Sequence, residues 1–249
     1  MTERDLPDVL GVPAGLRGGR SARDGYARGW GLEHGGLRAK ILEDPLYRRC
    51  AALTAGRSVQ EETKRLNLYL IVRFYLGRLA PGHVAEFGAY RGGSAIFLAA
   101  LCADVLPDAR VYAFDTFTGM PTTDKAVDAH NAGDFRDVDL GELRAYVGRV
   151  GLTNVEFIEG RFEDTARTAL ARIGSVALAH VDCDIGSAVG YSYDCVKPHL
   201  VDGGYVVFDD ALASGCLGAL EAVEERAIRR DGLHAEQAYP HLVYRVFRG

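Results

Sequence analysis

The chain lacks the features that mark membrane, secreted and disulfide-stabilised proteins. No apolar run approaches the ~18 residues that a membrane-spanning helix needs, and the first residues lack the apolar stretch of a signal peptide. The five cysteines are odd in number and form no CxxC pair, which argues against a zinc knuckle or a disulfide framework. We therefore expect a cytoplasmic protein with no membrane partner.

The chain also lacks an excess of positive charge. Its formal net charge is −5, so nothing in the composition favours a nucleic acid as the partner. With 48% hydrophobic and 25% charged residues, the 249-residue chain has an ordinary globular composition. Its length fits one large α/β domain, or one domain preceded by an extension.

The first part of the chain differs from the rest. Residues 1–37 are rich in Gly, Arg and Asp without a clear apolar face, and an irregular arm or lid fits them as well as a disordered tail does. A helical pattern over Gly36–Leu53 is broken at Pro45. We assign residues 1–57 to an N-terminal arm or lid and helix, and residues 58–249 to the main domain.

The main domain is expected to begin with a long helix over Val59–Leu79. Ser58 and Glu61 have the spacing of a capping box at its start. Apolar side chains occupy much of its circumference, which is typical of a well-buried helix and would also suit the interface of a homo-oligomer.

From Pro81 onward, strands and helices alternate. Their apolar runs are continuous, which indicates a sheet covered on both faces, and the short turn at Pro240-His241 makes the last two strands antiparallel. The fold class is α/β, with a doubly wound, mostly parallel, seven-stranded, Rossmann-like sheet and an N-terminal helical extension. Strands are expected over 84–88, 110–114, 155–159, 176–181, 205–208, 235–239 and 242–247, and helices over 94–105, 140–150, 164–173, 187–200 and 216–230.

Acidic residues follow two of these strands. Asp182 and Asp184 come after one, and Asp209 and Asp210 after the next. The carboxyl ends of parallel strands are where such sheets bind ligands, and converging carboxylates form the hard oxygen site that Mg²⁺ prefers. One alternative is that Asp182 or Asp184 caps the following helix. Another is that Asp184 takes the place of Asp182 as ligand or base.

A glycine-rich turn follows the first strand, over Glu86–Ser94. It does not have the GxGxxG spacing of dinucleotide-binding proteins, and a carboxylate at Glu86 would repel a pyrophosphate. A cationic ligand without a phosphate at that point, such as S-adenosylmethionine (SAM), fits better. A glycine turn with no role in binding is the alternative.

Other candidate residues follow the second and third strands or lie inside the fourth. Asp115 is placed to accept hydrogen bonds from ribose hydroxyls, and the turn Gly160–Phe162 is placed for adenine contacts. The loop Thr116–Val138 is long enough to be functional, and its His130 could orient or deprotonate an acceptor hydroxyl or could be merely solvated. His180 lies inside a strand, where a hydrogen-bonded core residue is expected.

Taken together, these segments resemble the macrocin O-methyltransferase (TylF-like) family over about residues 60–248. The segments are Ala85–Ser94, Phe114–Pro121, Glu159–Thr165, His180–Asp184 and Gly203–Asp210. The resemblance implies that the main domain has a class I SAM-dependent methyltransferase fold, with Mg²⁺ dependence and acceptors such as sugar hydroxyls on antibiotics.

The resemblance also implies roles for individual residues. It makes Asp182, Asp209 and Asp210 the metal ligands, with Asp182 also the proposed base. It places SAM against Glu86, Gly88, Ala89, Tyr90, Ser94, Asp115, Thr116, Gly160, Arg161, Phe162 and Asp182. The chain departs from the family at Ile185–Gly190, where an aromatic residue and a Ser-Ser/Thr run are usual, and this departure affects the identity of the acceptor.

The leading hypothesis is a SAM-dependent, Mg²⁺-assisted O-methyltransferase acting on a sugar or polyol hydroxyl of a glycosylated natural product. A bound Mg²⁺ would lower the pKa of the hydroxyl while a carboxylate or His130 accepts its proton. The alternatives are a metal-independent SAM-dependent N- or phenolic O-methyltransferase, an NAD-dependent oxidoreductase, and a SAM-binding protein without activity.

Overall fold

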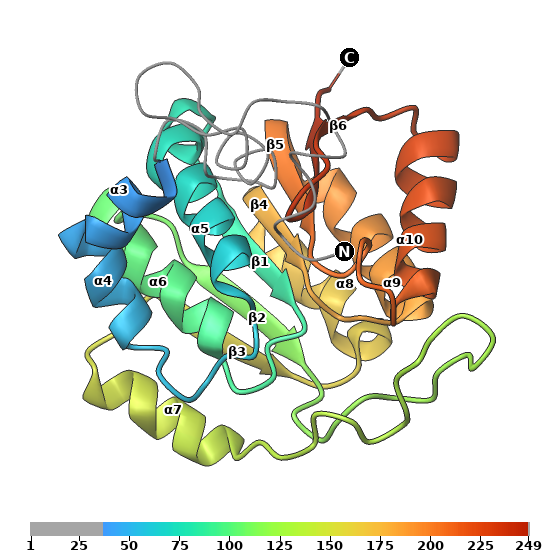
Figure 1. Ribbon diagram of the computed structural model, residues 1–249, viewed down its shortest axis with the longest axis horizontal. Helices are drawn as coiled ribbons and strands as arrows, with labels where there is room; N and C mark the ends of the chain where they lie inside the picture. The colour runs from blue at the N-terminus through green and yellow to red at the C-terminus, as the bar shows by residue number, and fades with distance from the viewer. Residues whose placement is uncertain (1–36, 249) are drawn as a thin grey trace, which may run out of the picture. The chain divides into compact units, whose positions relative to one another are not determined.

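The computed structural model describes residues 37–248 (Figure 1). The chain divides into two units, residues 1–44 and residues 45–249. Apart from Leu37, the predicted arm or lid over residues 1–37 lies outside the described residues. Within the described part of the first unit, α3 (Leu37–Glu43) is a short helix. None of the helices in residues 37–248 combines the length and the apolar character needed to cross a bilayer.

The second unit is built on a seven-stranded sheet with the order β3-β2-β1-β4-β5-β7-β6. The first five strands are parallel, β7 is antiparallel to β5, and β6 is antiparallel to β7. This confirms the predicted fold class and the antiparallel final pair. The strands are β1 (His83–Phe87), β2 (Val111–Asp115), β3 (Val155–Glu159), β4 (Val176–Val181), β5 (Leu200–Phe208), β6 (Ala235–Gln237) and β7 (Leu242–Val246).

Helices cover both faces of this sheet, as the continuous apolar strands predict (Figure 1). On one face α6 packs against β2 and β3 and is itself covered by α4 and α5. On the other face α8, α9 and α10 pack side by side. The helices of this unit are α4 (Pro45–Ala52), α5 (Glu62–Leu70), α6 (Gly93–Val105), α7 (Leu140–Arg149), α8 (Phe162–Ile173), α9 (Gly186–Val196) and α10 (Leu217–Val223), the last continued by a π-helical segment (Glu224–Arg230).

Helix α6 shows how the two layers are packed. Its sequence is apolar around the whole circumference, and residues from Gly93 to Cys102 are all buried, because the sheet lies on one side and other helices lie on the opposite side. The helix begins directly after the glycine turn that follows β1. Packing of α6 therefore fixes the position of that turn.

The predicted helix over Val59–Leu79 differs from the structure. It begins at Glu62, changes to a π-helical segment at Ile71–Tyr75, and ends in a 3₁₀ turn at Leu76–Arg78. The predicted capping box is wrong: Ser58 Oγ accepts the backbone N–H of Gln60 at 3.1 Å, and no side chain caps α5. Leu66, Leu68 and Val72 are buried, as expected of a well-buried helix, whereas Phe74 and Tyr75 near its end are exposed.

Candidate active site

A cavity of about 400 Å³ opens at the carboxyl ends of the parallel strands. Segments that follow β1, β2, β4 and β5 line it, together with the start of α8 after β3. The strand order reverses between β1 and β4, and this is the place where open α/β sheets bind their ligands. The region preceding α5 also lines the cavity, from Arg57 to Glu61.

The turn after β1 brings the backbone close to the neighbouring strand end. Gly88 has a φ of +94°, and a Cβ at this position would lie 1.6 Å from the carbonyl oxygen of Asp182. Only glycine fits both the conformation and the space. The turn therefore presents its backbone, without a side chain, to the floor of the cavity.

Asp115 holds this turn in place. Its Oδ2 accepts the backbone N–H groups of Ala89 and Tyr90 at 2.9 and 2.8 Å, and its Oδ1 accepts that of Phe117 at 2.8 Å. One carboxylate thus joins the ends of β1 and β2 while it lines the cavity. Sequence reasoning considered only a ribose contact for Asp115 and missed this link.

The predicted cofactor residues occupy two kinds of position. Glu86 and Gly160 do not line the cavity, whereas the others do: Gly88, Ala89, Tyr90, Ser94, Asp115, Thr116, Arg161, Phe162 and Asp182. Gly160 has a φ of +137° and donates its N–H to the carbonyl of Asp115, so it shapes the turn after β3. Glu86 is completely buried below the cavity floor.

The three predicted metal ligands converge. Strands β4 and β5 are parallel neighbours with Val181 opposite Phe208, so the acids that follow them lie side by side. One carboxylate oxygen from each of Asp182, Asp209 and Asp210 lies within 4.8 Å of the others. We refer to these three residues as the acidic cluster.

The three carboxylates have different affinities for a proton. Burial, together with the charges of Asp209 and Asp210, raises the pKa of Asp182 well above its usual range. Burial, with the charges of Asp184 and Asp209, raises the pKa of Asp210 to about 8. Burial also disfavours the charged form of Asp209, but hydrogen bonds from His180 and His241 outweigh it and hold its pKa well below the usual range.

Buried carboxylates at this separation repel each other unless positive charge or protons are present. Oxygen ligands of this kind are those that Mg²⁺ takes, and Mg²⁺ often binds through only one or two carboxylates plus water. The acidic cluster, which faces the cavity, therefore fits a hard divalent cation by its chemistry.

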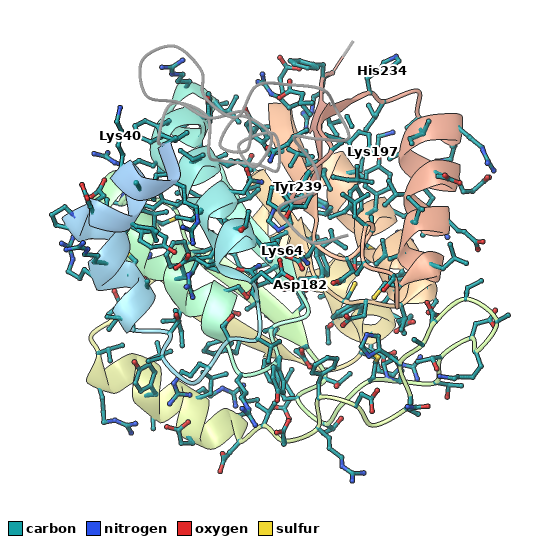
Figure 2. The ribbon with its side chains drawn as sticks, in the orientation of Figure 1. Lys40, Lys64, Asp182, Lys197, His234 and Tyr239 are labelled. Atoms are coloured by element: carbon teal, nitrogen blue, oxygen red, sulfur yellow. The ribbon has the colours of Figure 1, made fainter. Side chains whose placement is uncertain are left out.

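A cationic side chain already contacts this cluster. Lys64, from α5, lies near Asp182 of the cluster (Figure 2). It forms an ion pair with Asp209 Oδ2, and Gln60 donates from Nε2 to Asp209 Oδ1 at 3.0 Å. Burial disfavours the ammonium, but the Asp209 carboxylate more than offsets this and raises the pKa of Lys64. Sequence reasoning did not find either residue; the available signal was their spacing of four residues near the start of α5.

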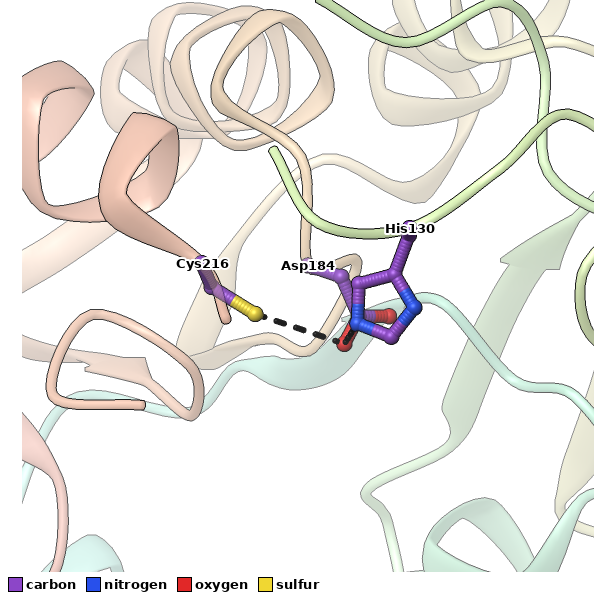
Figure 3. A group of neighbouring side chains, drawn as sticks. All are labelled: His130, Asp184 and Cys216. Carbon is purple, nitrogen blue, oxygen red and sulfur yellow. Dashed lines mark hydrogen bonds and ion pairs between the residues drawn. The ribbon is translucent and has the colours of Figure 1, made fainter. Parts of the chain in front are cut away.

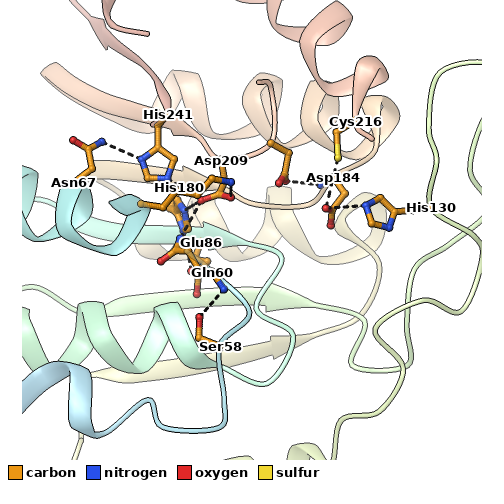
Figure 4. A network of polar contacts seen from close by, with 12 residues as sticks. Ser58, Gln60, Asn67, Glu86, His130, His180, Asp184, Asp209, Cys216 and His241 are labelled. Atoms are coloured by element: carbon orange, nitrogen blue, oxygen red, sulfur yellow. Dashed lines mark hydrogen bonds and ion pairs between the residues drawn. The ribbon is translucent and has the colours of Figure 1, made fainter. Parts of the chain in front are cut away.

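A buried chain of polar groups lies behind Asp209 (Figure 4). His241 Nε2 and His180 Nε2 lie 2.8 and 3.4 Å from Asp209 Oδ1. His180 Nδ1 lies 2.9 Å from Glu86 Oε1, and Asn67 Nδ2 lies 3.0 Å from His241 Nδ1. The prediction that His180 is a hydrogen-bonded core residue is confirmed.

The protonation of this chain follows from its environment. Burial works against a charged His180, yet hydrogen bonds to Asp209 and Glu86 raise its pKa well above the usual range. Burial lowers the pKa of His241, so its neutral ring donates from Nε2 to Asp209 and accepts at Nδ1 from Asn67. Glu86 thus contacts the site through His180; its Oε2 is buried without a hydrogen-bond partner.

The predicted catalytic histidine lies at the edge of the cavity, beside a different aspartate. His130 Nε2 is 3.2 Å from Asp184 Oδ1, and Asp184 lines the cavity. The Asp184 backbone N–H donates to Asp210 Oδ2 at 2.9 Å, which links this pair to the acidic cluster. Burial, with the charge of Asp209, raises the pKa of Asp184 to about 6.

The alternative reading of Asp182 and Asp184 as helix caps is wrong. Helix α9 begins after Ile185 with no side-chain cap. The backbone N–H of Gly186 instead donates to Asp128 Oδ1 at 3.2 Å, from the long loop between β2 and α7. This leaves the carboxylates of Asp182 and Asp184 on the cavity side.

Comparisons with known proteins identify relatives of this chain. A family model described as macrocin-O-methyltransferase (TylF) matches residues 64–234. A tetracenomycin-type 4'-O-methyltransferase of Streptomyces olivaceus, named for a dimethoxy-rhamnosyl substrate, is 33% identical over 168 residues, covering 63% of this chain and 64% of that protein. The mycinamicin III 3''-O-methyltransferase of Micromonospora griseorubida is 30% identical over 179 residues, covering 66% of this chain and 68% of that protein.

Solved structures show the same fold. The O-methyltransferase NovP superposes with a TM-score of 0.65 at 24% identity, covering 85% of this chain and 95% of NovP. The calicheamicin methyltransferase CalS11 superposes with a TM-score of 0.58 at 24% identity, covering 84% of this chain and 96% of CalS11.

Proposed function

The chain belongs to the macrocin O-methyltransferase (TylF) family, and from this premise we propose that it transfers a methyl group from SAM to a sugar hydroxyl of a natural product, assisted by Mg²⁺. The observation that carries the proposal is the acidic cluster beside the glycine turn, in one cavity at the carboxyl ends of the strands. The name of the Streptomyces olivaceus relative includes a dimethoxy-rhamnosyl group, which supports a sugar acceptor.

The donor side of the cavity is assigned to the β1 turn. The absence of a side chain at Gly88 lets the backbone approach a ligand closely, and Asp115 offers its remaining acceptor capacity to ribose hydroxyls. Arg161 and Phe162 at the start of α8 line the part of the cavity expected to hold the adenine. Tyr90 and Ser94 line the same side, with Thr116.

The acceptor side is assigned to the acidic cluster and its neighbours. Asp182, Asp209 and Asp210 would hold the Mg²⁺, which when bound would lower the pKa of the acceptor hydroxyl as a Lewis acid. Methyl transfer is an in-line displacement at a sulfonium carbon, so the protein contributes mainly by positioning the two reactants.

The proton of the hydroxyl needs an acceptor at the same edge. Asp182 was the first candidate, but its carboxylate is committed to the acidic cluster. The pair of Asp184 and His130 is better suited, because a base works best with a pKa near the working pH and the pKa of Asp184 is about 6. We assign proton acceptance to this pair, with Asp182 as the metal ligand between it and the donor.

A metal-independent methyltransferase is the second candidate, and the ion pair of Lys64 with Asp209 favours it. In that case the ammonium of Lys64 would supply the positive charge that the acidic cluster needs. Activity measured after chelation and gel filtration, then with Mg²⁺ restored, separates the two functions. The Mg²⁺-assisted function requires loss of turnover and its recovery; full activity in excess EDTA would leave the metal-independent one.

The Mg²⁺-assisted and the metal-independent functions both require SAM as the methyl donor, and a binding experiment tests this requirement. Titration calorimetry with S-adenosylhomocysteine should give a single site, and NAD should give no heat. Binding of NAD in place of S-adenosylhomocysteine would favour the oxidoreductase alternative and contradict both methyltransferase functions.

A further inference from the structure

Three different ligand types meet at the edge of the cavity, next to the acidic cluster. His130 comes from the loop between β2 and α7, Asp184 follows β4, and Cys216 precedes α10 (Figure 3). His130 Nε2 lies 3.2 Å from Asp184 Oδ1, and Cys216 Sγ lies 3.8 Å from the same oxygen. The three ligand atoms all lie within 4.8 Å of one another.

The two separations from Asp184 Oδ1, 3.2 and 3.8 Å, lie within a few tenths of an ångström of the edges of a zinc coordination tetrahedron. Zinc–ligand bonds of about 2.0–2.3 Å to N, O and S give edges of about 3.3–3.6 Å between ligand atoms. Imidazole, thiolate and carboxylate are the ligands of zinc and related ions, whereas Mg²⁺ takes oxygen. We propose that His130, Asp184 and Cys216 form a second metal site, selective for Zn²⁺ or a similar borderline-soft divalent cation.

The coordination would be that of an open site. Three protein ligands leave a fourth position, and Asp184 lines the cavity, so that position faces the space where ligands enter. The site differs in chemistry from the acidic cluster, which offers only carboxylate oxygens. The two are joined by the hydrogen bond from the Asp184 backbone to Asp210.

The surroundings of His130 provide an independent argument. Zinc-binding histidines usually direct their second ring nitrogen at a carboxylate or a carbonyl group. His130 Nδ1 lies 3.6 Å from Asp134 Oδ2, and that oxygen accepts the backbone N–H of Asn131 at 2.8 Å. This separation is longer than a hydrogen bond, but it places a carboxylate that is itself held in place on the Nδ1 side of the ring, while Nε2 faces Asp184.

The position of Cys216 is fixed by the backbone. Its N–H donates to the carbonyl of Ala213 at 3.0 Å, and it forms an isolated antiparallel bridge with Asp128. The neighbouring N–H of Ala129 donates to the carbonyl of Gly215 at 2.9 Å. These bonds tie the loop that carries His130 to the segment that carries Cys216, so the two ligands are brought together before an ion arrives.

Binding would be linked to protons. Burial, with the charges of Asp210 and Asp184, raises the pKa of the Cys216 thiol to about 12, so the thiol is protonated in the free protein. An ion that binds the thiolate must release that proton to solvent. Affinity should therefore increase with pH, and binding should release at least one proton.

One consequence rests on the proposed function. Asp184 and His130 are the proposed proton acceptors, and an ion bound between them would occupy the lone pairs that the reaction needs. Zinc should then inhibit methyl transfer, while Mg²⁺ supports it.

The test is a Co²⁺ titration of the chelator-treated full-length chain, followed by absorption spectroscopy. With Mg²⁺ in excess to fill the acidic cluster, we expect a sulfur-to-cobalt charge-transfer band and the intense visible bands of four-coordinate Co²⁺. These bands should saturate at one Co²⁺ per chain and be lost on addition of Zn²⁺. Cys216→Ser should abolish the charge-transfer band. The matched control Cys195→Ser removes another buried thiol and should keep it, as should Asp182→Asn in the acidic cluster.

No charge-transfer band in the wild-type chain, or a band that survives Cys216→Ser, would overturn the proposal. Circular dichroism checks that the variants fold, and His130→Gln serves as a second ligand variant, expected to lose the four-coordinate visible bands. Asp134→Asn should weaken Co²⁺ binding by about 10-fold. Because the spectra need neither SAM nor an acceptor, they are independent of the proposed methyl transfer.

Discussion

Replacement of Lys64 by methionine should make the protein less stable without Mg²⁺ and bind Mg²⁺ more tightly. Lys64 forms an ion pair with Asp209, whose side chain is 5% exposed, while that of Lys64 is 17% exposed. When Mg²⁺ occupies the acidic cluster, the ammonium must leave Asp209. The same pair therefore stabilises the metal-free protein and opposes metal binding.

The size of the expected loss of stability follows from the burial of the Lys64–Asp209 pair. Removal of one partner from a fully buried ion pair costs about 3–5 kcal/mol, and we expect about 2 kcal/mol here because Lys64 is partly exposed and neighbouring acids can take up a proton. A loss of about 2 kcal/mol corresponds to a Tm about 4–8 °C lower for a chain of this size. Mg²⁺ binding to Lys64→Met does not have to break this ion pair, so the variant should bind Mg²⁺ about 30-fold more tightly than the wild type.

The assay combines thermal unfolding with titration calorimetry. In EDTA, Lys64→Met should unfold below the wild type; in saturating Mg²⁺ the two should unfold at the same temperature. Lys197→Met is the matched control, since Lys197 pairs with Asp231 at 2.9 Å, among residues outside the cavity lining. Its effect should be independent of Mg²⁺. Weaker or unchanged Mg²⁺ binding by Lys64→Met would refute the reasoning.

Three further predictions concern the cavity. Gly88→Ala should lower the free energy of unfolding, measured in urea, by more than about 4 kcal/mol, because its Cβ would collide with Asp182. Gly151→Ala is the control: Gly151 has a φ of +74° but open space around it, so the loss should be about 1 kcal/mol. Asp182→Asn should lower kcat by at least about 100-fold and keep the affinity for S-adenosylhomocysteine in calorimetry; unchanged turnover would contradict its role. With Asp184 as proton acceptor, kcat/KM should fall as pH drops through about 6, and Asp184→Asn should remove this dependence.

The pattern of apolar residues along the sequence was sufficient to predict the sheet. Each of the seven strands lies within the predicted run or overlaps it, because continuous apolar stretches between helices have few other structures available. The convergence of Asp182 with Asp209 and Asp210 also followed, since acids at the ends of adjacent parallel strands must meet. These inferences need only the period of the pattern and the topology that it implies.

The groups around Asp209 could not be predicted in the same way. Lys64 lies in α5 and Gln60 just before it, both far earlier in the chain than Asp209. His241 follows the Tyr239-Pro240 peptide, just before β7. Their contacts with Asp209 depend on how α5 and β7 pack on β5. The four-residue spacing of Gln60 and Lys64 places both on one side of the chain but does not say which strand end they reach. The predicted capping box failed for a related reason, since Ser58 belongs to the cavity wall.

The different affinities of the three acids for protons suggest a division of roles within the cluster. Asp209 receives hydrogen bonds from two histidines, Gln60 and Lys64, so it keeps its charge whether or not an ion is present. Among residues 37–248, no such set of donors surrounds Asp182 or Asp210, and burial raises the pKa of each. The chain therefore fixes one anionic ligand through its fold and leaves two others to hold protons until a cation displaces them. A site built in this way is tolerated in the metal-free protein, which three permanently charged and buried carboxylates would not be.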